Sequence, residues 1–238
     1  MDIKNEWHKI WDNKGTDEKK FNKNNLLETF IQLKLYDGFD MINKKNVNSF
    51  IEYHTTIKSN ILSRFPNAKS IYEIGCGSGA ELFLYEHQGF KTGGIDYSKS
   101  LLNISKQVLS SDDLILDEAI NIHVSPAYDV ILSNSVFSYF TNINYANSVL
   151  EKAYKKAKSM IILTDIFDTE KQGTYEKFRE KAIPDYKNKY KNLDKLFYSK
   201  DYFVNFAKEH NMKVEFKNVP IEGYWNNDFV YNCFMYRI

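Results

Sequence analysis

The spacing of hydrophobic residues divides the chain at about residue 70. Before that point apolar side chains recur every three or four positions, which is the period of amphipathic helices. The longest such segment runs from Val47 to Leu62, and Gly38 and Pro66 are helix stop signals. The pattern therefore predicts a helical segment over residues 1–69 that precedes the first strand.

Beyond residue 70 short β-branched runs alternate with helical patterns. The runs predict strands at 71–74, 91–95, 114–116, 126–132, 160–164, 213–219 and 229–237. Helical periods fall at 80–87, 98–108 and 142–156, and a further helix begins at about residue 199. Strands that alternate with helices favour the α/β class with a doubly wound, Rossmann-like sheet.

The first predicted strand ends in a glycine-rich turn, which is the most informative segment of the chain. Gly75, Gly77 and Gly79 are separated by single residues, and a helical pattern follows at once. Glycines permit tight backbone angles there and, having no Cβ, allow a ligand to lie against the main chain. Asp96 ends the second predicted strand, where an acid can accept hydrogen bonds from the ribose hydroxyls of a nucleoside.

The residues Glu73, Gly75, Gly77 and Gly79 resemble the first motif, E-x-G-x-G-x-G, of the class I S-adenosyl-L-methionine (SAM) dependent methyltransferases. The resemblance covers residues 70–165 and implies SAM as the cofactor, with S-adenosyl-L-homocysteine (SAH) as its product. It also implies a seven-stranded, mostly parallel sheet with a reversed last strand.

Two other interpretations of the turn remain open. Gly75, Gly77 and Ala80 also satisfy the dinucleotide pattern G-x-G-x-x-G/A, and a glycine turn can simply connect two elements. Gly79 is unnecessary in the dinucleotide pattern, and the carboxylate of Glu73 suits a cationic amino-acid ligand better than a pyrophosphate. These features favour SAM over NAD.

The resemblance assigns further positions to the cofactor. Glu118 and Ala119, at the end of the third strand, match the adenine contacts, with Asp117 as the off-by-one alternative and a solvated acidic loop as the other interpretation. Polar residues at the end of the fourth strand are placed to touch the methionine part. The candidate cofactor-binding residues are Glu73, Gly75, Cys76, Gly77, Gly79, Asp96, Tyr97, Ser98, Asp117, Glu118, Ala119, Ser133, Asn134, Ser135 and Trp11.

Two segments outside this core are candidates for covering the site. Trp7 and Trp11 share a helical face with Ile10, which is either a packing face or a lid over the cofactor. The polar residues after the fifth strand form an insertion where a cap over the substrate would lie. We therefore expect one domain with an N-terminal helical lid (1–69), a cofactor-binding core (70–165), a cap insertion (166–198) and a C-terminal helix with two strands (199–238).

Candidate residues for the acceptor come from the fifth strand and from the segments after it. Asp165 ends that strand at the same crevice and is a candidate general base by position. Arg179 has a guanidinium that can grip phosphate or carboxylate bidentately, whereas the lysine run 187–195 indicates a solvated face. The candidate substrate-binding residues are Tyr175, Arg179, Tyr198, Tyr224 and Asn227.

A second resemblance concerns the segments outside the core. Tyr175 with Arg179, residues 196–200 and residues 223–227 look like a bacterial subgroup of small-molecule methyltransferases, which often has His where Lys195 stands. Some members are linked to surface-carbohydrate or natural-product pathways. The resemblance implies methyl transfer to an oxygen of a sugar, a nucleotide sugar or a phosphorylated metabolite. The alternatives are a non-catalytic SAM-binding regulatory or assembly protein, and an NAD-dependent oxidoreductase.

Composition and charge narrow the possible partners. The 238-residue chain is 43% hydrophobic, which is enough for a core, and its net charge of +1 argues against a nucleic-acid groove. No apolar run has the length of a membrane span, and the N-terminus lacks the apolar region of a signal peptide. Cys76 and Cys233 lie far apart and form neither a disulfide framework nor a metal site. We expect a cytoplasmic monomer or homodimer that acts on a small-molecule acceptor, with no metal, nucleic-acid or membrane partner.

Overall fold

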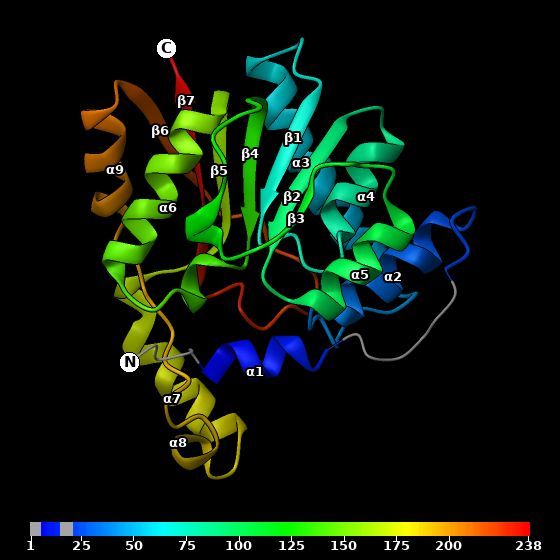
Figure 1. Ribbon diagram of the computed structural model, residues 1–238. Helices are drawn as coiled ribbons and strands as arrows, with labels where there is room; N and C mark the ends of the chain where they lie inside the picture. The colour runs from blue at the N-terminus through cyan, green and yellow to red at the C-terminus, as the bar shows by residue number, and fades with distance from the viewer. Residues whose placement is uncertain (1–5, 15–20) are drawn as a thin grey trace.

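A seven-stranded mixed sheet organises the computed structural model, which describes residues 6–14 and 21–238 (Figure 1). The strand order is β3-β2-β1-β4-β5-β7-β6, and β7 runs antiparallel to both of its neighbours. The predicted α/β class with a reversed last strand is therefore confirmed. The strands are β1 (Ser70–Ile74), β2 (Lys91–Asp96), β3 (Leu114–Leu116), β4 (Tyr128–Asn134), β5 (Ala157–Phe167), β6 (Met212–Lys217) and β7 (Val230–Arg237).

Helices cover both faces of this sheet and the carboxyl ends of its parallel strands (Figure 1). The helices of the described ranges are α1 (Glu6–Asp12), α2 (Leu26–Tyr36), α3 (Val47–Arg64), α4 (Ala80–His87), α5 (Lys99–Val108), α6 (Ile143–Lys156), α7 (Gln172–Ala182), α8 (Tyr186–Lys189) and α9 (Lys200–Glu209). Short 3₁₀ turns are η1 (Ala119–Asn121), η2 (Phe137–Tyr139) and η3 (Thr169–Lys171). No helix in the described ranges is long and apolar enough to cross a bilayer.

Successive side chains of the central strands point to opposite faces of the sheet, so hydrophobic residues pack on both faces. In β1 the side chain of Ile71 packs with α2, α3, α4 and α5, whereas that of Tyr72 packs on the other face with α6 and α9. Successive strand residues point to opposite faces, so Glu73 projects toward the same side as Ile71. The acid of the glycine motif therefore faces α2 and α4 from within the sheet.

The fifth strand differs from its prediction in length and in regularity. It extends over Ala157–Phe167, where the pattern predicts residues 160–164, because its continuation pairs with β7. The register shifts between Leu163 and Ile166, and Asp165 within this bulge has a φ of +59°. A bulge re-aims a side chain, and this one directs Asp165 to the carboxyl end of the sheet.

Two helical segments lie against that end of the sheet. Figure 1 shows α1 below the carboxyl ends of the parallel strands and next to the helices α7 and α8, which follow β5. The side chain of Trp7 in α1 donates a hydrogen bond to the carbonyl of Asp194 at 3.0 Å. The N-terminal segment and the insertion after β5 thus meet over the edge where the candidate residues lie.

Candidate active site

The glycine turn is fixed in place by the end of α2. Ser78 donates its backbone N–H to Asp37 Oδ1 at 2.8 Å and its hydroxyl to the carbonyl of Leu33 at 2.9 Å. Gly77 has a φ of +51°, and a Cβ on it would lie 2.5 Å from Asp37 Oδ1. The close approach of Asp37 therefore requires glycine at position 77.

Gly79 has a different role from the one that the motif implies. Its φ is +83°, and it precedes the first residue of α4. A Cβ there would lie 2.9 Å from the Cβ of Ser105 in α5, and Gly79 does not line the main cavity. We assign Gly79 to close packing of α4 against α5, not to ligand contact.

A cavity of about 530 Å³ opens at the carboxyl ends of β1, β2, β4 and β5. This volume falls within the range of about 300–1,000 Å³ that is usual for small-molecule sites. Thirteen of the candidate residues line it: Trp11, Glu73, Gly75, Cys76, Gly77, Asp96, Tyr97, Glu118, Ala119, Asn134, Ser135, Asp165 and Tyr224.

Four carboxylates surround the inner part of this cavity. Asp37, Glu73, Glu81 and Asp96 all line it, whereas Lys34 lines a small adjoining pocket that shares Glu81 with the cavity. Lys34 pairs with Glu81 at 3.3 Å, and His54 contacts the other oxygen of Glu81 at 3.1 Å. Although burial alone would raise it, these two neighbours hold the pKa of Glu81 at about 2.

For the remaining acids burial outweighs the opposing influences, among them the charge of Lys34 on Glu73 and Asp37. Burial, followed by the charges of Glu81 and Asp37, raises the pKa of Glu73 well above its ordinary value, and Glu73 Oε2 has no hydrogen-bond partner among the described residues. Burial likewise raises the pKa of Asp37 to about 7. Clustered carboxylates disfavour one another's ionised forms, so this wall is stabilised by a cationic ligand and destabilised by a pyrophosphate.

Asp96 is held at the tip of β2 by backbone donors. Its Oδ2 accepts from the N–H of Gly77 and its Oδ1 from the N–H of Ser98, both at 2.8 Å. Burial nevertheless raises the pKa of Asp96 to about 6. Each oxygen keeps a further lone pair for a ligand, which matches the position expected for ribose binding.

The end of β3 places one of the two alternative acids at the cavity. Glu118 and Ala119 line it, whereas Asp117 does not. The carboxylate of Asp117 instead accepts from Asn121 Nδ2 and from the N–H of Glu118, both at 2.7 Å. Asp117 therefore caps the turn that leads into η1, and the off-by-one alternative has no place in the cavity wall.

Helix α1 closes the outer side of the same cavity. Trp7, His8 and Trp11 all line it. His8 Nε2 lies 3.3 Å from Glu118 Oε1, and the carbonyl of Trp11 accepts a hydrogen bond from Ser98 Oγ at 3.1 Å. These contacts place α1 where the lid interpretation requires it.

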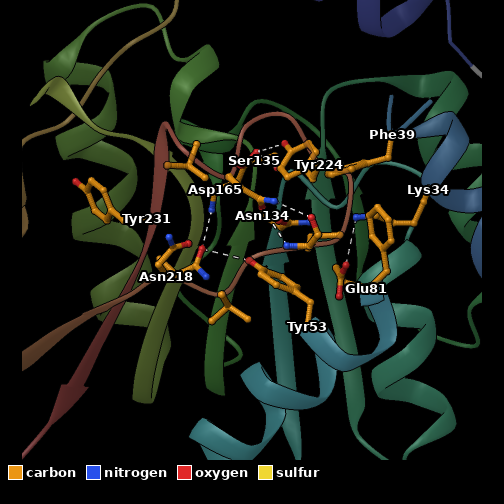
Figure 2. A pocket seen from close by; sticks show the side chains of 16 residues that line it. Lys34, Phe39, Tyr53, Glu81, Asn134, Ser135, Asp165, Asn218, Tyr224 and Tyr231 are labelled. Atoms are coloured by element: carbon orange, nitrogen blue, oxygen red, sulfur yellow. Dashed lines mark hydrogen bonds and ion pairs between the residues drawn. The ribbon is translucent and has the colours of Figure 1, made fainter. Parts of the chain in front are cut away.

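Asp165 lies at the opposite end of the cavity within a group of polar side chains. Its Oδ2 accepts from Ser135 Oγ at 2.5 Å and from the hydroxyl of Tyr224 at 2.8 Å. Figure 2 shows this group at one end of a small adjoining pocket, with Lys34 and Glu81 at the other. Asp165 Oδ1 is buried without a hydrogen-bond partner among the described residues, so one oxygen can still accept a proton or a hydrogen bond.

Four other candidate residues are placed in structural roles outside the main cavity. Ser98 caps α5, and Ser133 donates its hydroxyl to the carbonyl of Ile74 at 3.1 Å. Tyr198 is buried in the core and donates to the carbonyl of Phe137 at 2.8 Å. Asn227 holds its own loop by two hydrogen bonds to the backbone of Ile221. The structure does not bring these side chains to the cavity.

The charged residue that the insertion places at the cavity is not the one that the sequence predicts. Tyr175 is buried against Phe167 and Phe229, and Arg179 lies among aromatic rings and does not line the main cavity. Lys195, which the sequence pattern includes in a solvated lysine run, lines the cavity instead. Burial, with the charge of Arg179 adding to it, lowers the pKa of Lys195 to about 8.

Sequence reasoning missed several further contributors to the wall, among them Asp37 and Phe39. Both follow α2, where the sequence pattern indicates only a helix end at Gly38. They reach the site because the end of α2 lies against the glycine turn, some 40 residues later in the chain. Asp37 accepts a hydrogen bond from the N–H of Ser78 at this contact. The sequence signal that could have pointed to Asp37 is its position directly before Gly38, the glycine that ends the helix.

Comparison with known proteins assigns this site to a class. Residues 72–159 match the family model described as a methyltransferase domain. The chain is 25% identical over 168 residues to the malonyl-[acyl-carrier protein] O-methyltransferase of Priestia megaterium, covering 69% of this chain and 54% of that protein. It is 27% identical over 117 residues to the phosphoethanolamine N-methyltransferase of Plasmodium falciparum, covering 46% and 44%. The chain thus spans about half the length of the curated relatives that it matches.

A solved structure shares the fold over nearly the whole chain. The magnesium protoporphyrin IX methyltransferase of Synechocystis PCC 6803 with bound SAH superposes with a TM-score of 0.61 at 11% identity, covering 92% of this chain and 100% of that one. The chain therefore has a fold shared with this methyltransferase, and its residues 72–159 match a methyltransferase domain model. The matched family model and the relatives are methyltransferases, which is the class that the sequence predicts, and the superposed structure holds SAH, the product of the predicted cofactor.

Proposed function

We propose that this protein transfers a methyl group from SAM to an oxygen of a small-molecule acceptor. The observation that carries the proposal is the combination of an acid-lined cavity at the glycine turn with a partly unsatisfied carboxylate, Asp165, at its far end. Bound SAM supplies an activated methyl group on a positively charged sulfur. The chain's own residues then have to hold that cofactor, align the acceptor and receive its proton.

The cofactor fits the residues that line the inner cavity. Asp96 would accept the ribose hydroxyls, and Glu118 with Ala119 would contact the adenine. Glu73 and Asp37 offer carboxylate oxygens to the ammonium group of the methionine part, and Glu73 Oε2 is buried without another partner in the described chain. A ligand cation there relieves the mutual repulsion of these acids.

Asp165 is the proposed proton acceptor. Ser135 and Tyr224 both donate to Oδ2, which fixes the plane of the carboxylate and leaves Oδ1 without a hydrogen-bond partner among the described residues. The backbone N–H of Asp165 is held by Asn232 Oδ1 at 3.0 Å, and Tyr53 donates to the same oxygen at 3.2 Å. An anchored carboxylate suits an acceptor hydroxyl, which must lose its proton during methylation.

The acceptor that we propose is a sugar, a nucleotide sugar or a phosphorylated metabolite of a surface-carbohydrate or natural-product pathway. The support is the polar character of the acceptor side of the cavity, where Asn134, Ser135, Tyr224 and Asn226 line the wall. Hydroxyl and amide groups of this kind hydrogen-bond to polyhydroxylated molecules.

Turnover of methyl-labelled SAM with a panel of nucleotide sugars, sugar phosphates and neutral sugars tests this proposal. We expect label in at least one acceptor together with release of SAH. Tight SAM binding without transfer to any acceptor in the panel or in a metabolite extract would favour a non-catalytic SAM-binding protein instead.

Asp37→Asn is expected to weaken SAM binding about tenfold at pH 8. The amide still accepts from the N–H of Ser78 but no longer attracts the cofactor's ammonium group, and a hydrogen bond to a charged group contributes about 1.5–3 kcal/mol. Because the pKa of Asp37 lies at about 7, the wild-type affinity should fall as the pH drops through 7 and Asp37 is protonated. The variant should lack this part of the pH dependence.

Fluorescence titration of SAM against both proteins measures these affinities. The matched control is Asp40→Asn, which changes an exposed carboxylate three positions further along the same loop and should leave the affinity unchanged. Equal affinity of Asp37→Asn and wild type across this pH range would remove Asp37 from the proposed ammonium site.

A further inference from the structure

We propose that Lys195 on the cap side of the cavity wall, together with Arg179, which packs on the wall residue Trp225, forms an anion-binding subsite that selects acceptors carrying a carboxylate or phosphate group. This inference rests on the proposed function and names the acceptor class more narrowly. The two side chains come from the insertion between β5 and α9.

Lys195 places an ammonium group at the cavity wall next to aromatic rings. The ammonium group lies 4.3 Å from the ring centre of Phe167 and 4.6 Å from that of Tyr139, and the hydrogen bond that it donates to the hydroxyl of Tyr139 is long at 3.4 Å. No carboxylate in the described residues forms an ion pair with it. Rings stabilise an ammonium group only modestly, so the charge remains available to a ligand.

Arg179 is similarly surrounded by rings and not by acids. Its guanidinium carbon lies 4.7 Å from the ring centre of Trp225, 4.9 Å from that of Tyr190 and 5.3 Å from that of Tyr186. Its Nε is buried with no hydrogen-bond partner within residues 6–14 and 21–238. Aromatic faces hold the guanidinium plane and leave its edge N–H groups free to grip an anion bidentately.

Two buried lysines, Lys34 and Lys156, show how the charge of an ammonium group is satisfied elsewhere in the described chain. Lys34 pairs with Glu81 at 3.3 Å, and Lys156 donates to the carbonyls of His123 and Pro126, both at 2.9 Å. Within residues 6–14 and 21–238, Lys195 and Arg179 have no carboxylate or carbonyl acceptor of this kind, and the like charge of Arg179 lowers the pKa of Lys195. An anion bound between them would satisfy both side chains and remove their repulsion.

The position of the pair relative to Asp165 gives the subsite its function. Lys195 and Asp165 line the same cavity, and the charge of Asp165 acts on Lys195. An acceptor whose hydroxyl reaches Asp165 would therefore extend its anionic group toward the insertion. The acids at the inner end attract the cationic cofactor, whereas Lys195 and Arg179 attract an anionic acceptor. The two ends of the cavity therefore favour ligands of opposite charge.

The chain's tryptophans allow this subsite to be tested without knowing the acceptor. All three, Trp7, Trp11 and Trp225, line the cavity, and Trp225 contacts Arg179 directly. We would saturate the full chain with SAH and titrate it with inorganic phosphate, acetate or neutral glycerol at constant ionic strength, while recording tryptophan emission. The phosphate and acetate arms distinguish a phosphorylated acceptor from a carboxylate acceptor by which anion binds more tightly.

We expect a saturable emission change with at least one anion and none with glycerol. Lys195→Met and Arg179→Gln should each weaken that binding at least tenfold, which corresponds to about 1.4 kcal/mol. The matched control, Lys191→Met, removes an exposed lysine of the same insertion and should leave anion binding unchanged. SAH affinity should be the same in all of these proteins, which also shows that they are folded.

The pH dependence of acetate binding provides a second readout. Lys195 faces Trp7 from α1, Tyr139 from η2, Phe167 and Asp165 from β5, and the charge of Arg179 from α7. Burial raises the pKa of Tyr139, so this phenol stays neutral. Since the pKa of Lys195 is about 8, acetate affinity should fall as the pH rises through 8 in wild type, and Lys195→Met should lack this fall.

Two results would overturn the subsite. One is the absence of saturable anion binding to a protein that binds SAH normally, and the other is equal anion binding by Lys195→Met, Arg179→Gln and wild type. Failure of SAH itself to bind would instead reject the proposed function, so the two failures are distinguishable.

Discussion

Asp96→Ala is expected to weaken SAM binding about a hundredfold or more. Asp96 is held by the N–H groups of Gly77 and Ser98, both at 2.8 Å, so its carboxylate is already oriented before the cofactor binds. Two hydrogen bonds from ribose hydroxyls to a charged acceptor contribute about 1.5–3 kcal/mol each, and about 1.4 kcal/mol corresponds to tenfold in affinity. Isothermal titration calorimetry with SAM and with SAH measures the loss.

The pH dependence and a matched variant make this prediction specific to Asp96. Because burial raises the pKa of Asp96 to about 6, wild-type affinity should fall as the pH drops through 6 and the carboxylate is protonated. The matched variant is Asp117→Ala. Asp117 lies at the end of the neighbouring strand β3, where it caps a turn, and the SAM affinity of this variant should equal that of wild type. An unchanged affinity in Asp96→Ala would show that the cofactor binds elsewhere.

Asp165→Asn is expected to reduce kcat at least a hundredfold while leaving SAM affinity within about twofold of wild type. General-base catalysis contributes about 10²–10⁴-fold, and an amide cannot accept the acceptor's proton. Tyr224→Phe removes one donor to Oδ2 and keeps the ring, so its loss should be smaller. Steady-state turnover of labelled SAM with the acceptor found in the panel measures both effects.

The control for Asp165 is a neighbouring carboxylate outside the cavity. Glu170 is exposed in the turn that follows β5, and Glu170→Gln should retain full kcat. If Asp165→Asn also retained full kcat, Asp165 would act in positioning or folding, and the acceptor would lose its proton to another group or carry none.

The parts of the site that depend on local sequence were predictable. The turn from Gly75 to Gly79, the acid at the end of β2 and the pair Glu118–Ala119 all lie at strand ends that hydrophobic periodicity locates. Strand ends in a parallel sheet meet at one edge, so strand order alone brings these residues together. The fold class followed from the same alternation of strands and helices.

The parts that depend on distant contacts were not predictable in this way. Asp37 reaches the site because the end of α2 hydrogen-bonds to Ser78, and no local pattern encodes that contact. Tyr198 and Lys195 are near neighbours in sequence, yet Tyr198 enters the core and Lys195 faces the cavity. The bulge that aims Asp165 arises from pairing of β5 with β7 some 65 residues later.

The central claim is that an acid-lined cavity at the glycine turn binds the positively charged cofactor SAM. Calorimetric titration of the purified protein with SAM, SAH, NAD⁺ and NADH in parallel tests it most directly. We predict saturable heat at one site per chain with SAM and with SAH, and none with NAD⁺ or NADH. The absence of heat with SAM and SAH, together with clean titration by NAD⁺ or NADH, would contradict the account.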